Sequence, residues 1–208
     1  MLSMLVLFSS QARATDQWES RDWFFTEGSS IINIVQSDGS IKQVDAYANT
    51  YIEPLPTPNQ GRIMVPIRII GEAVLGAFVQ WKDEQKEIYM IYGVPLQGGG
   101  EQYKEIRMFP YSKTSSHLRD REAAKIVEVT SWKENTPDLE ENGKKYLENM
   151  IIDIPPEIKE NTGITFIPLR FVCEIFFSNV HWDASVPMGQ RVVSVNSRVG
   201  FIPAWIPH

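Results

Sequence analysis

The chain has 208 residues, of which 43% are hydrophobic and 22% are charged, with a formal net charge of −6 and a pI near 5.2. This composition predicts a globular protein with a sizeable core in one or two domains, and it argues against a disordered chain. The acidic balance argues against a nucleic-acid partner, because phosphates demand a basic surface.

The N-terminus, residues 1–14, is predicted to be a secretory signal peptide. A short apolar run is followed by Ala12-Arg13-Ala14, an Ala-x-Ala site at which cleavage is expected after Ala14. The alternative is an ordinary apolar N-terminus that frays. No segment reaches the roughly eighteen apolar residues that a membrane span requires. We therefore expect an extracellular or cell-envelope protein without a membrane span.

Strand signals begin after the N-terminus. Asp38-Gly39 stands between two apolar runs, which is a strong hairpin signal. Prolines at 54, 56 and 58 restrict residues 47–52 to at most an edge strand. Two hairpins are expected in this half of the chain, one from residues 31–35 and 41–44 and one from residues 78–81 and 88–92.

The segment Gly98–Gly100 is the best candidate for a boundary, as a linker or a hairpin loop, since three glycines resist ordering. It lacks the Gly-Lys-Ser/Thr ending of a phosphate-binding loop. A strand at residues 105–109 is a candidate to complete the first sheet. Further strands are expected at residues 125–132, at 144–154, and in a pair formed by 180–182 and 191–195.

One stretch of the sequence occurs twice, as residues 62–81 and 164–182. Each copy predicts a strand, a helix of about ten residues beginning at a proline, and a strand ending in tryptophan. Gly76 is expected to end the first helix and Ser178-Asn179 the second. Self-similarity of this kind indicates one supersecondary unit used twice. The matched residues are Pro66 and Pro168, Arg68 and Arg170, Glu72 and Glu174, and Trp81 and Trp182.

These residues resemble the copper amine oxidase N-terminal-like domain, the stalk module of bacterial secreted proteins. The similarity is clearest at 166–174, with His181-Trp-Asp183 after it and the Pro155-Pro156 segment before it. The copy around Pro66 is looser. The resemblance implies two tandem non-catalytic modules of α+β class, over residues 15–97 and 101–208, each an antiparallel sheet with one short helix.

The family name does not imply oxidase activity. The catalytic domain of a copper amine oxidase needs three metal-binding histidines and a tyrosine in an Asn-Tyr-Asp/Glu setting. The only histidines here are His117, His181 and His208, and no Asn-Tyr pair occurs. Neither His117 nor His181 has a second ligand at a metal-binding spacing. We predict no catalytic, cofactor-binding or metal-binding residue.

Glu72 and Glu174 are the most tempting acids, because hydrolases pair carboxylates across a bond. Each has an arginine four residues earlier, Arg68 or Arg170, which would lower its pKa and favours an ion pair on the helix surface. We expect these acids to be structural. If they are catalytic instead, the alternative function is that of an extracellular hydrolase using the groove between the two units.

Three further residues have a structural and a functional interpretation. Cys173, the single cysteine, is a candidate nucleophile, but its apolar neighbours favour a place in the core. Trp81 and Trp182 could stack on sugar rings, but their equivalent positions favour core anchors. The function expected is that of a structural spacer or a binding module for cell-wall glycan or an envelope protein.

Overall fold

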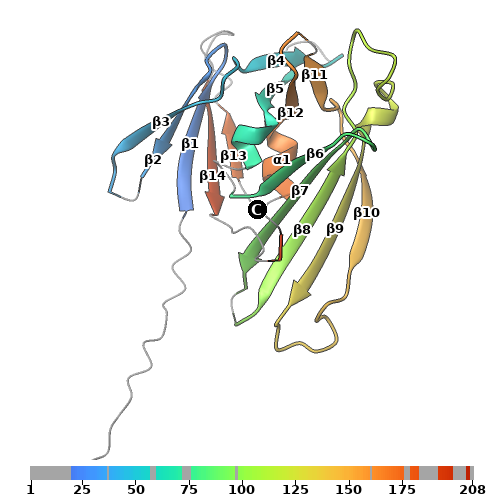
Figure 1. Cartoon of the computed structure of the whole chain (residues 1–208). Helices are drawn as coiled ribbons and strands as arrows, with labels where there is room; N and C mark the ends of the chain where they lie inside the picture. Colours follow the sequence, from blue (N-terminus) through green and yellow to red (C-terminus); the bar gives the residue numbers. More distant parts are fainter. Residues whose placement is uncertain are drawn as a thin grey trace, which may run out of the picture.

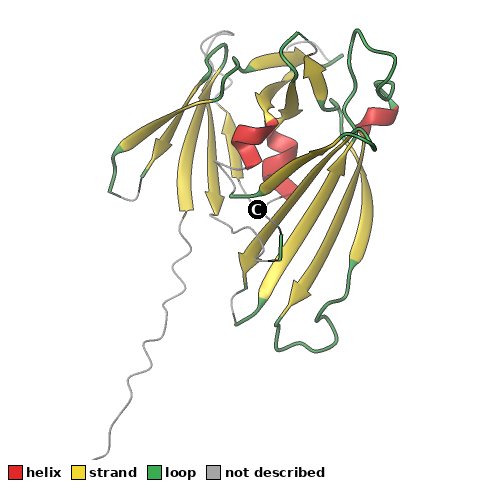
Figure 2. Cartoon of the chain, viewed as in Figure 1, coloured by secondary structure: helices red, strands yellow, loops and turns green. Residues whose placement is uncertain are grey.

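The computed structural model describes residues 20–36, 38–56, 60–71, 76–96, 98–159, 161–175, 179–182, 192–198 and 205–206. The predicted signal peptide, residues 1–14, lies outside them. Strands dominate and helices are short (Figure 2). The fold is therefore mainly β, and the α+β expectation is corrected. The physical reason is that nearly every segment outside the two short helical regions pairs edge to edge in an antiparallel ladder.

The strands of the described residues follow the expected hairpins closely. The Asp38-Gly39 hairpin is confirmed, as are the pairs expected at 78–81 with 88–92 and at 180–182 with 191–195. The strands are β1 Ser20–Thr26, β2 Ile31–Val35, β3 Ile41–Asp45, β4 Tyr51–Pro54, β5 Gly61–Pro66, β6 Phe78–Lys82, β7 Glu87–Pro95, β8 Glu101–Met108, β9 Ile126–Glu134, β10 Tyr146–Ile151, β11 Glu157–Lys159, β12 Ile164–Pro168, β13 Asn179–Trp182 and β14 Val192–Arg198.

The strands form three antiparallel sheets. Sheet I has the order β13-β14-β1-β2-β3, sheet II has the order β10-β9-β8-β7-β6, and the smaller sheet III has the order β11-β12-β5-β4. Sheets I and II splay to either side of sheet III, with helix α1, Leu169–Ile175, between them (Figure 1). A 3₁₀ turn, Ala123–Lys125, precedes β9.

Sheets I and II each combine strands from both halves of the chain. In sheet I, β1 pairs with β14, so that Phe25 lies opposite Val193. In sheet II, β7 pairs with β8 across the glycine-rich segment, which is a hairpin loop. The strand expected at 105–109 is part of β8, Glu101–Met108, and it does continue the sheet begun by β6 and β7. The two halves of the chain therefore share both large sheets.

The helical segments begin one residue later than predicted. Pro66 and Pro168 are the last residues of β5 and β12, and residues 67–71 and α1 follow them. A proline suits both places, because its fixed φ fits a strand end as well as a first helical turn. Gly76 has φ +66°, the left-handed conformation predicted at the end of the first helix. Asn179, expected to end the second helix, instead begins β13.

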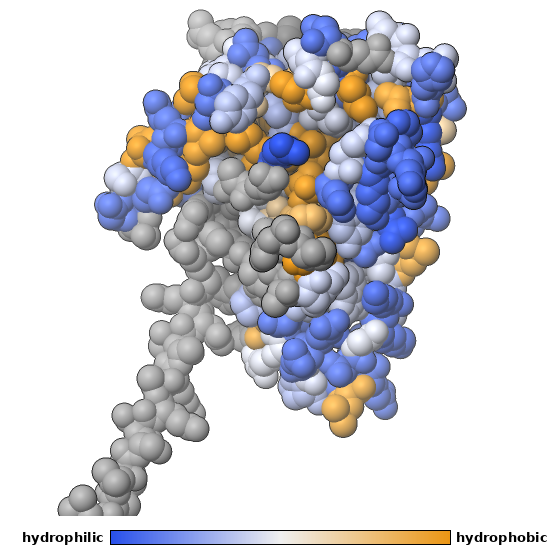
Figure 3. Space-filling model, viewed as in Figure 1, coloured by the Kyte–Doolittle hydropathy of each residue, from blue (hydrophilic) through white to orange (hydrophobic). Residues whose placement is uncertain are grey.

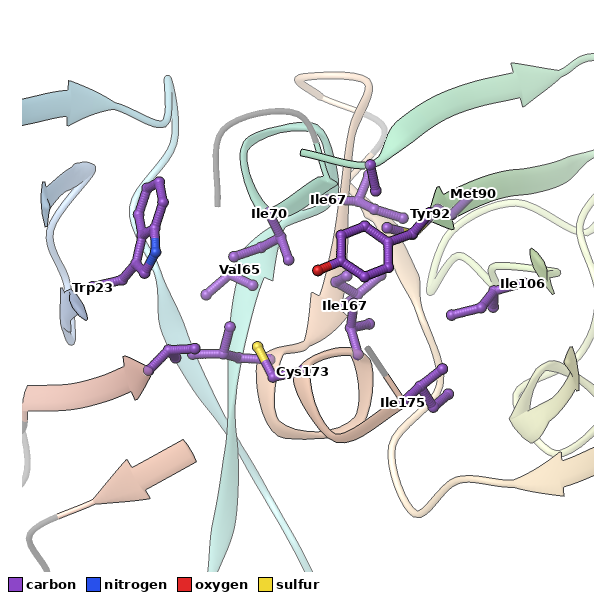
Figure 4. Close-up of a cluster of buried hydrophobic side chains, with 14 of the residues drawn as sticks. Trp23, Val65, Ile67, Ile70, Met90, Tyr92, Ile106, Ile167, Cys173 and Ile175 are labelled. Atoms are coloured by element: carbon purple, nitrogen blue, oxygen red, sulfur yellow. The ribbon is translucent and has the colours of Figure 1, made fainter. Parts of the chain in front are cut away.

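The main core lies where sheets I and II meet the helical segments. Side chains from the two large sheets, such as Trp23 and Ile106, converge on Val65, Ile167 and Cys173 (Figure 4). Burying a valine or isoleucine side chain, such as those of Val65 and Ile167, stabilises a fold by about 1.5–3 kcal/mol. The Cys173 thiol is fully buried, which raises its pKa, and the prediction that it is core filler is confirmed.

A glycine holds β6 close to the first helical segment. A Cβ atom at Gly71 would lie 1.9 Å from Cγ2 of Val79 and 3.4 Å from Cε of Met90. No side chain fits in that space, so the backbone of residues 67–71 can approach β6 only with glycine at this position. The contact fixes the strand that carries Trp81.

The opposite face of sheet II has a second, aromatic cluster. Tyr103 and Trp132 stack with ring centroids 5.3 Å apart, and the Trp205 ring lies 6.4 Å from each of them. Ile206 is buried in the same cluster. Trp205 and Ile206, near the C-terminus, therefore pack on this face of sheet II. Within the described residues, no helix is long and apolar enough to cross a membrane.

Candidate functional site

An apolar groove opens where sheets I, II and III meet. Its volume is about 600 Å³, and its lining includes Tyr47, Ile67, Ile69, Trp81, Ile158 and Ile164. Figure 3 shows apolar side chains gathered on this face, between the two large sheets. We refer to this hollow as the Tyr47 groove. A concave apolar surface with a few polar groups is the usual form of a ligand site.

The loop after β3 places Tyr47 on one wall of the groove. The amide of Ala46 donates to the carbonyl of Ser30 at 2.7 Å, and Ala46 is buried. The Tyr47 amide then donates to Oδ1 of Asp45 at 2.8 Å. Tyr47 has φ +60°, and 84% of its surface is exposed. A bulky residue in this conformation is strained, and strain of this kind gathers at functional sites.

The other wall is formed by β6. Trp81 is 39% exposed, and its Nε1–H donates to Oδ1 of Asp83 at 3.4 Å. The expectation that Trp81 is a core anchor is therefore wrong. The physical reason is that β6 is the edge strand of sheet II, and no further strand of the described residues lies beside it to cover the indole. The side chain of Trp182 lies outside the described part of the chain.

The floor and rim of the groove differ in polarity. Ile67 on the floor is buried, and Ile158 and Ile164 beside it are half-buried. Arg68 and Gln80, both exposed, belong to the same lining. The groove therefore offers two exposed aromatic rings, an apolar floor and polar side chains with hydrogen-bonding capacity.

A buried carboxylate lies behind the groove, in sheet III. Glu157 is only 2% exposed, and its carboxylate accepts hydrogen bonds from the Tyr51 hydroxyl and from Lys159 Nζ, each at 2.8 Å. Burial alone would raise the pKa of Glu157, but these bonds and nearby Lys113 hold it below its usual value. Burial and the same carboxylate raise the pKa of Tyr51. Since each donor is satisfied by an acceptor in the fold, we interpret this cluster as structural.

The same cluster anchors the loop before β9. Lys113 Nζ lies 3.5 Å from Oε2 of Glu53 and 3.7 Å from Oε1 of Glu157. Arg121 lies 3.5 Å from the other oxygen of Glu53. The two basic side chains therefore tie residues 112–121 to β4 and β11.

Of the two acids weighed from the sequence, the structure describes Glu174. Glu174 is exposed, and its Oε1 accepts a hydrogen bond from Arg170 Nε at 2.6 Å, as the four-residue spacing predicts. Glu72 lies outside the described residues. His117 is exposed in a loop, and the His181 side chain is also outside them. Among the described residues, no three histidine, cysteine or acidic side chains lie close enough together for a metal ion.

Sequence reasoning missed Tyr47. The only signal was an aromatic residue among the small and polar residues 46–50, directly after a predicted strand. Most of the other lining residues come from β5, the helical residues 67–71, β6, β7, β11 and β12, so their proximity is a property of the tertiary fold alone.

Comparison with known proteins adds no assignment, because no protein-family model, curated protein or solved structure matches this chain. The resemblance to the stalk module therefore stays a prediction.

Proposed function

We propose that this protein is a secreted or envelope-associated binding module without catalytic activity, built from two stalk-type units, and that its Tyr47 groove binds a cell-wall glycan. The observation that carries the proposal is Tyr47, whose backbone is strained and whose side chain is exposed at the edge of an apolar hollow opposite Trp81. Backbone strain of this kind clusters at ligand-binding sites, which is why we place the ligand here.

The strand pairing between the two halves supports the repeated unit. The sequence match of Pro66 with Pro168 makes Val65 equivalent to Ile167 and Met64 equivalent to Phe166. In sheet III, Val65 lies opposite Ile167, and Met64 and Pro66 lie opposite Pro168 and Phe166. A rotation of 180° about an axis through the Val65–Ile167 pair would therefore place each residue of β5 on its equivalent in β12, which is the relation that a local two-fold axis requires.

The element order supports the same interpretation. Strands β1–β5, the helical residues 67–71 and then β6–β7 are followed by β8–β12, α1 and β13–β14. The units of this proposal are therefore interlocked, since each large sheet takes three strands from one unit and two from the other.

The two-fold relation also makes the Tyr47 groove distinct from its counterpart. Tyr51 lies opposite Met64 and Glu157 lies opposite Phe166, so Tyr51 and Glu157 are equivalent. Tyr47 and Asp153 each lie four residues before these positions, which makes them equivalent too. Ile164 is likewise equivalent to Arg62. Arg62 Nη2 and Asp153 Oδ2 form an ion pair at 2.5 Å. An ion pair therefore occupies the second site, where the first has an aromatic and an aliphatic side chain.

A glycan fits the groove better than a purely apolar ligand. The faces of sugar rings carry C–H groups that stack on aromatic side chains, and their hydroxyl groups need the kind of donors and acceptors that Arg68 and Gln80 carry. Glu174, in contrast, is exposed and its carboxylate accepts a hydrogen bond from Arg170 on the helix surface. This supports binding without turnover.

Co-sedimentation of the purified chain with insoluble cell-wall polysaccharide tests the proposal. We expect the wild-type chain to sediment with the polysaccharide and to release no soluble sugar. Trp81→Ala and Tyr47→Gly should each weaken retention by about tenfold, which corresponds to about 1.4 kcal/mol. Leu139→Ala is the matched control, because Leu139 is 84% exposed and lies outside the groove.

Two results would contradict the glycan proposal. One is equal retention of the wild-type chain and the groove variants. The other is retention by whole envelope that is lost when envelope proteins are removed, since the ligand would then be a protein.

A further inference from the structure

We propose that a pocket between strand β10 and helix α1 is a second glycan site, which binds one uncharged sugar ring. The inference rests on the proposed function, since it assumes that this chain binds a glycan. The pocket and the Tyr47 groove have no lining residue in common, so the second site adds a separate point of attachment.

The pocket is small and has two aromatic side chains in its lining. Its volume is about 290 Å³. Tyr146 of β10 and Phe171 of α1 line it from two different elements, and Tyr146 is 45% exposed. Val129 and Ile175, in the same lining, are buried. Small-molecule sites usually measure about 300–1,000 Å³, so this pocket has room for one ring rather than for several.

Three polar side chains form a row across the pocket. Lys104 on β8 lies opposite Ser131 on β9, and Ser131 lies opposite Tyr146 on β10. Residues directly opposite in a ladder share a face and have Cβ atoms about 4.5–5.5 Å apart. The Ser131 hydroxyl is half-buried and makes no hydrogen bond to another described residue. It can therefore donate to, and accept from, a hydroxyl group of a ligand.

The charges of the pocket are balanced, which favours an uncharged ligand. Burial lowers the pKa of Lys104, and the nearby carboxylate of Glu148 opposes that shift. Glu174, which is exposed, accepts a hydrogen bond from Arg170 at 2.6 Å. A charged ligand would thus meet no uncompensated opposite charge in this lining. The hydroxyl groups of a sugar, in contrast, can bond with the remaining N–H groups and carboxylate oxygens.

The two sites lie close together along β12 and α1. Thr165 lines the Tyr47 groove and Phe171 lines the pocket. Because consecutive Cα atoms lie about 3.8 Å apart, these positions, six residues apart in the chain, are separated by no more than about 23 Å. A polysaccharide is long enough to reach both sites. Binding at the first site then raises the effective concentration of the glycan at the second and strengthens retention.

An NMR titration of the full chain with N-acetylglucosamine, an uncharged sugar, tests the proposal. We expect saturable shifts of the amide signals of Ser131 and Phe171. Ser131→Val should raise the dissociation constant measured at Phe171 by about fivefold, because one hydrogen bond is lost. Thr130→Val is the matched control, since it removes a hydroxyl from the other face of β9 and should leave the constant unchanged.

Glucuronate and protonated glucosamine are the anionic and cationic probes, and each should bind at the pocket at least about fivefold more weakly than N-acetylglucosamine. Tighter binding of either charged sugar, or an unchanged dissociation constant in Ser131→Val, would overturn the inference.

The same spectra separate the two sites. Shifts confined to groove residues such as Trp81 would overturn the second site and leave the proposed function intact. Shifts at Ser131 and Phe171 without a response at Trp81 would support the pocket and contradict the groove.

Discussion

Replacement of Tyr47 by glycine is expected to stabilise the fold while it removes ligand binding. Tyr47 has φ +60°, a conformation that costs an L-residue about 1–2 kcal/mol and costs glycine almost nothing. Its side chain is 84% exposed, so little buried apolar area is lost with the ring. Most substitutions destabilise a protein, and the opposite sign here would separate a functional residue from a structural one.

The magnitude follows from two opposing contributions. Relief of the backbone strain contributes about 1–2 kcal/mol, and the greater freedom of glycine in the unfolded chain offsets about 0.5–1 kcal/mol of it. We therefore expect Tyr47→Gly to be about 0.5–1 kcal/mol more stable than the wild-type chain. Tyr47→Ala is the matched control, because it removes the ring and keeps the strained φ. The glycine variant should be about 1 kcal/mol more stable than the alanine variant.

Urea denaturation of the three proteins measures these differences through the unfolding midpoint. For a chain of this length, 1 kcal/mol corresponds to about 2–4 °C in thermal midpoint. A glycine variant less stable than the alanine variant would refute the reasoning, because it would mean that residue 47 is not strained. Increased stability with full retention on the polysaccharide would refute the role of Tyr47 in binding.

Other predictions concern the core and the buried carboxylate. Glu157→Gln should cost about 2 kcal/mol near neutral pH in urea denaturation, because a charged acceptor of two hydrogen bonds is lost. Since the pKa of Glu157 in the folded state lies below the ordinary value of 4.5, its stabilisation is present above that pH and is lost as the pH falls through the folded-state pKa. The free energy of unfolding of Glu157→Gln should therefore depend less on pH, and an equal pH dependence would contradict this assignment. Gly71→Ala should lower the free energy of unfolding by about 1–3 kcal/mol, because the new methyl group overlaps Val79. Val79→Ala in the same chain should recover part of that loss. If the effects of the two substitutions simply add in this double-mutant cycle, the overlap is contradicted. The Cys173 thiol should react with a thiol reagent only as fast as the chain opens, so rapid reaction under native conditions would contradict its burial.

Local signals in the sequence predicted most of the strands. Asp38-Gly39 fixes its hairpin because its backbone needs no long-range contact to turn, and Ser40 N–H donates to Oδ1 of Asp38 at 2.9 Å. The left-handed residue at Gly76 and the ion pair of Arg170 with Glu174 were equally predictable, since each depends on residues close together in the chain. The burial of Cys173 followed from its apolar neighbours on one helix.

The predictions that failed depend on packing between distant segments. The helices were expected to define an α+β fold, but pairing of β1 with β14 and of β7 with β8 makes the structure mainly β. Trp81 was expected in the core because its position matches Trp182, and the open edge at β6 leaves it exposed instead. The prolines after residue 53 did indicate an edge strand, and β4 is one. The sequence of β6 has no such signal, so its place at the edge of sheet II depends on partners far along the chain.

The sequence by itself determined where the chain turns, which short segments form strands and that Cys173 is buried, because local backbone preferences and apolar periodicity decide these features. Only the tertiary structure decided that the two halves share their large sheets and that Tyr47 faces Trp81 across a groove. These features arise from pairings between residues far apart in the chain, whose register is selected by the whole core rather than by any local pattern.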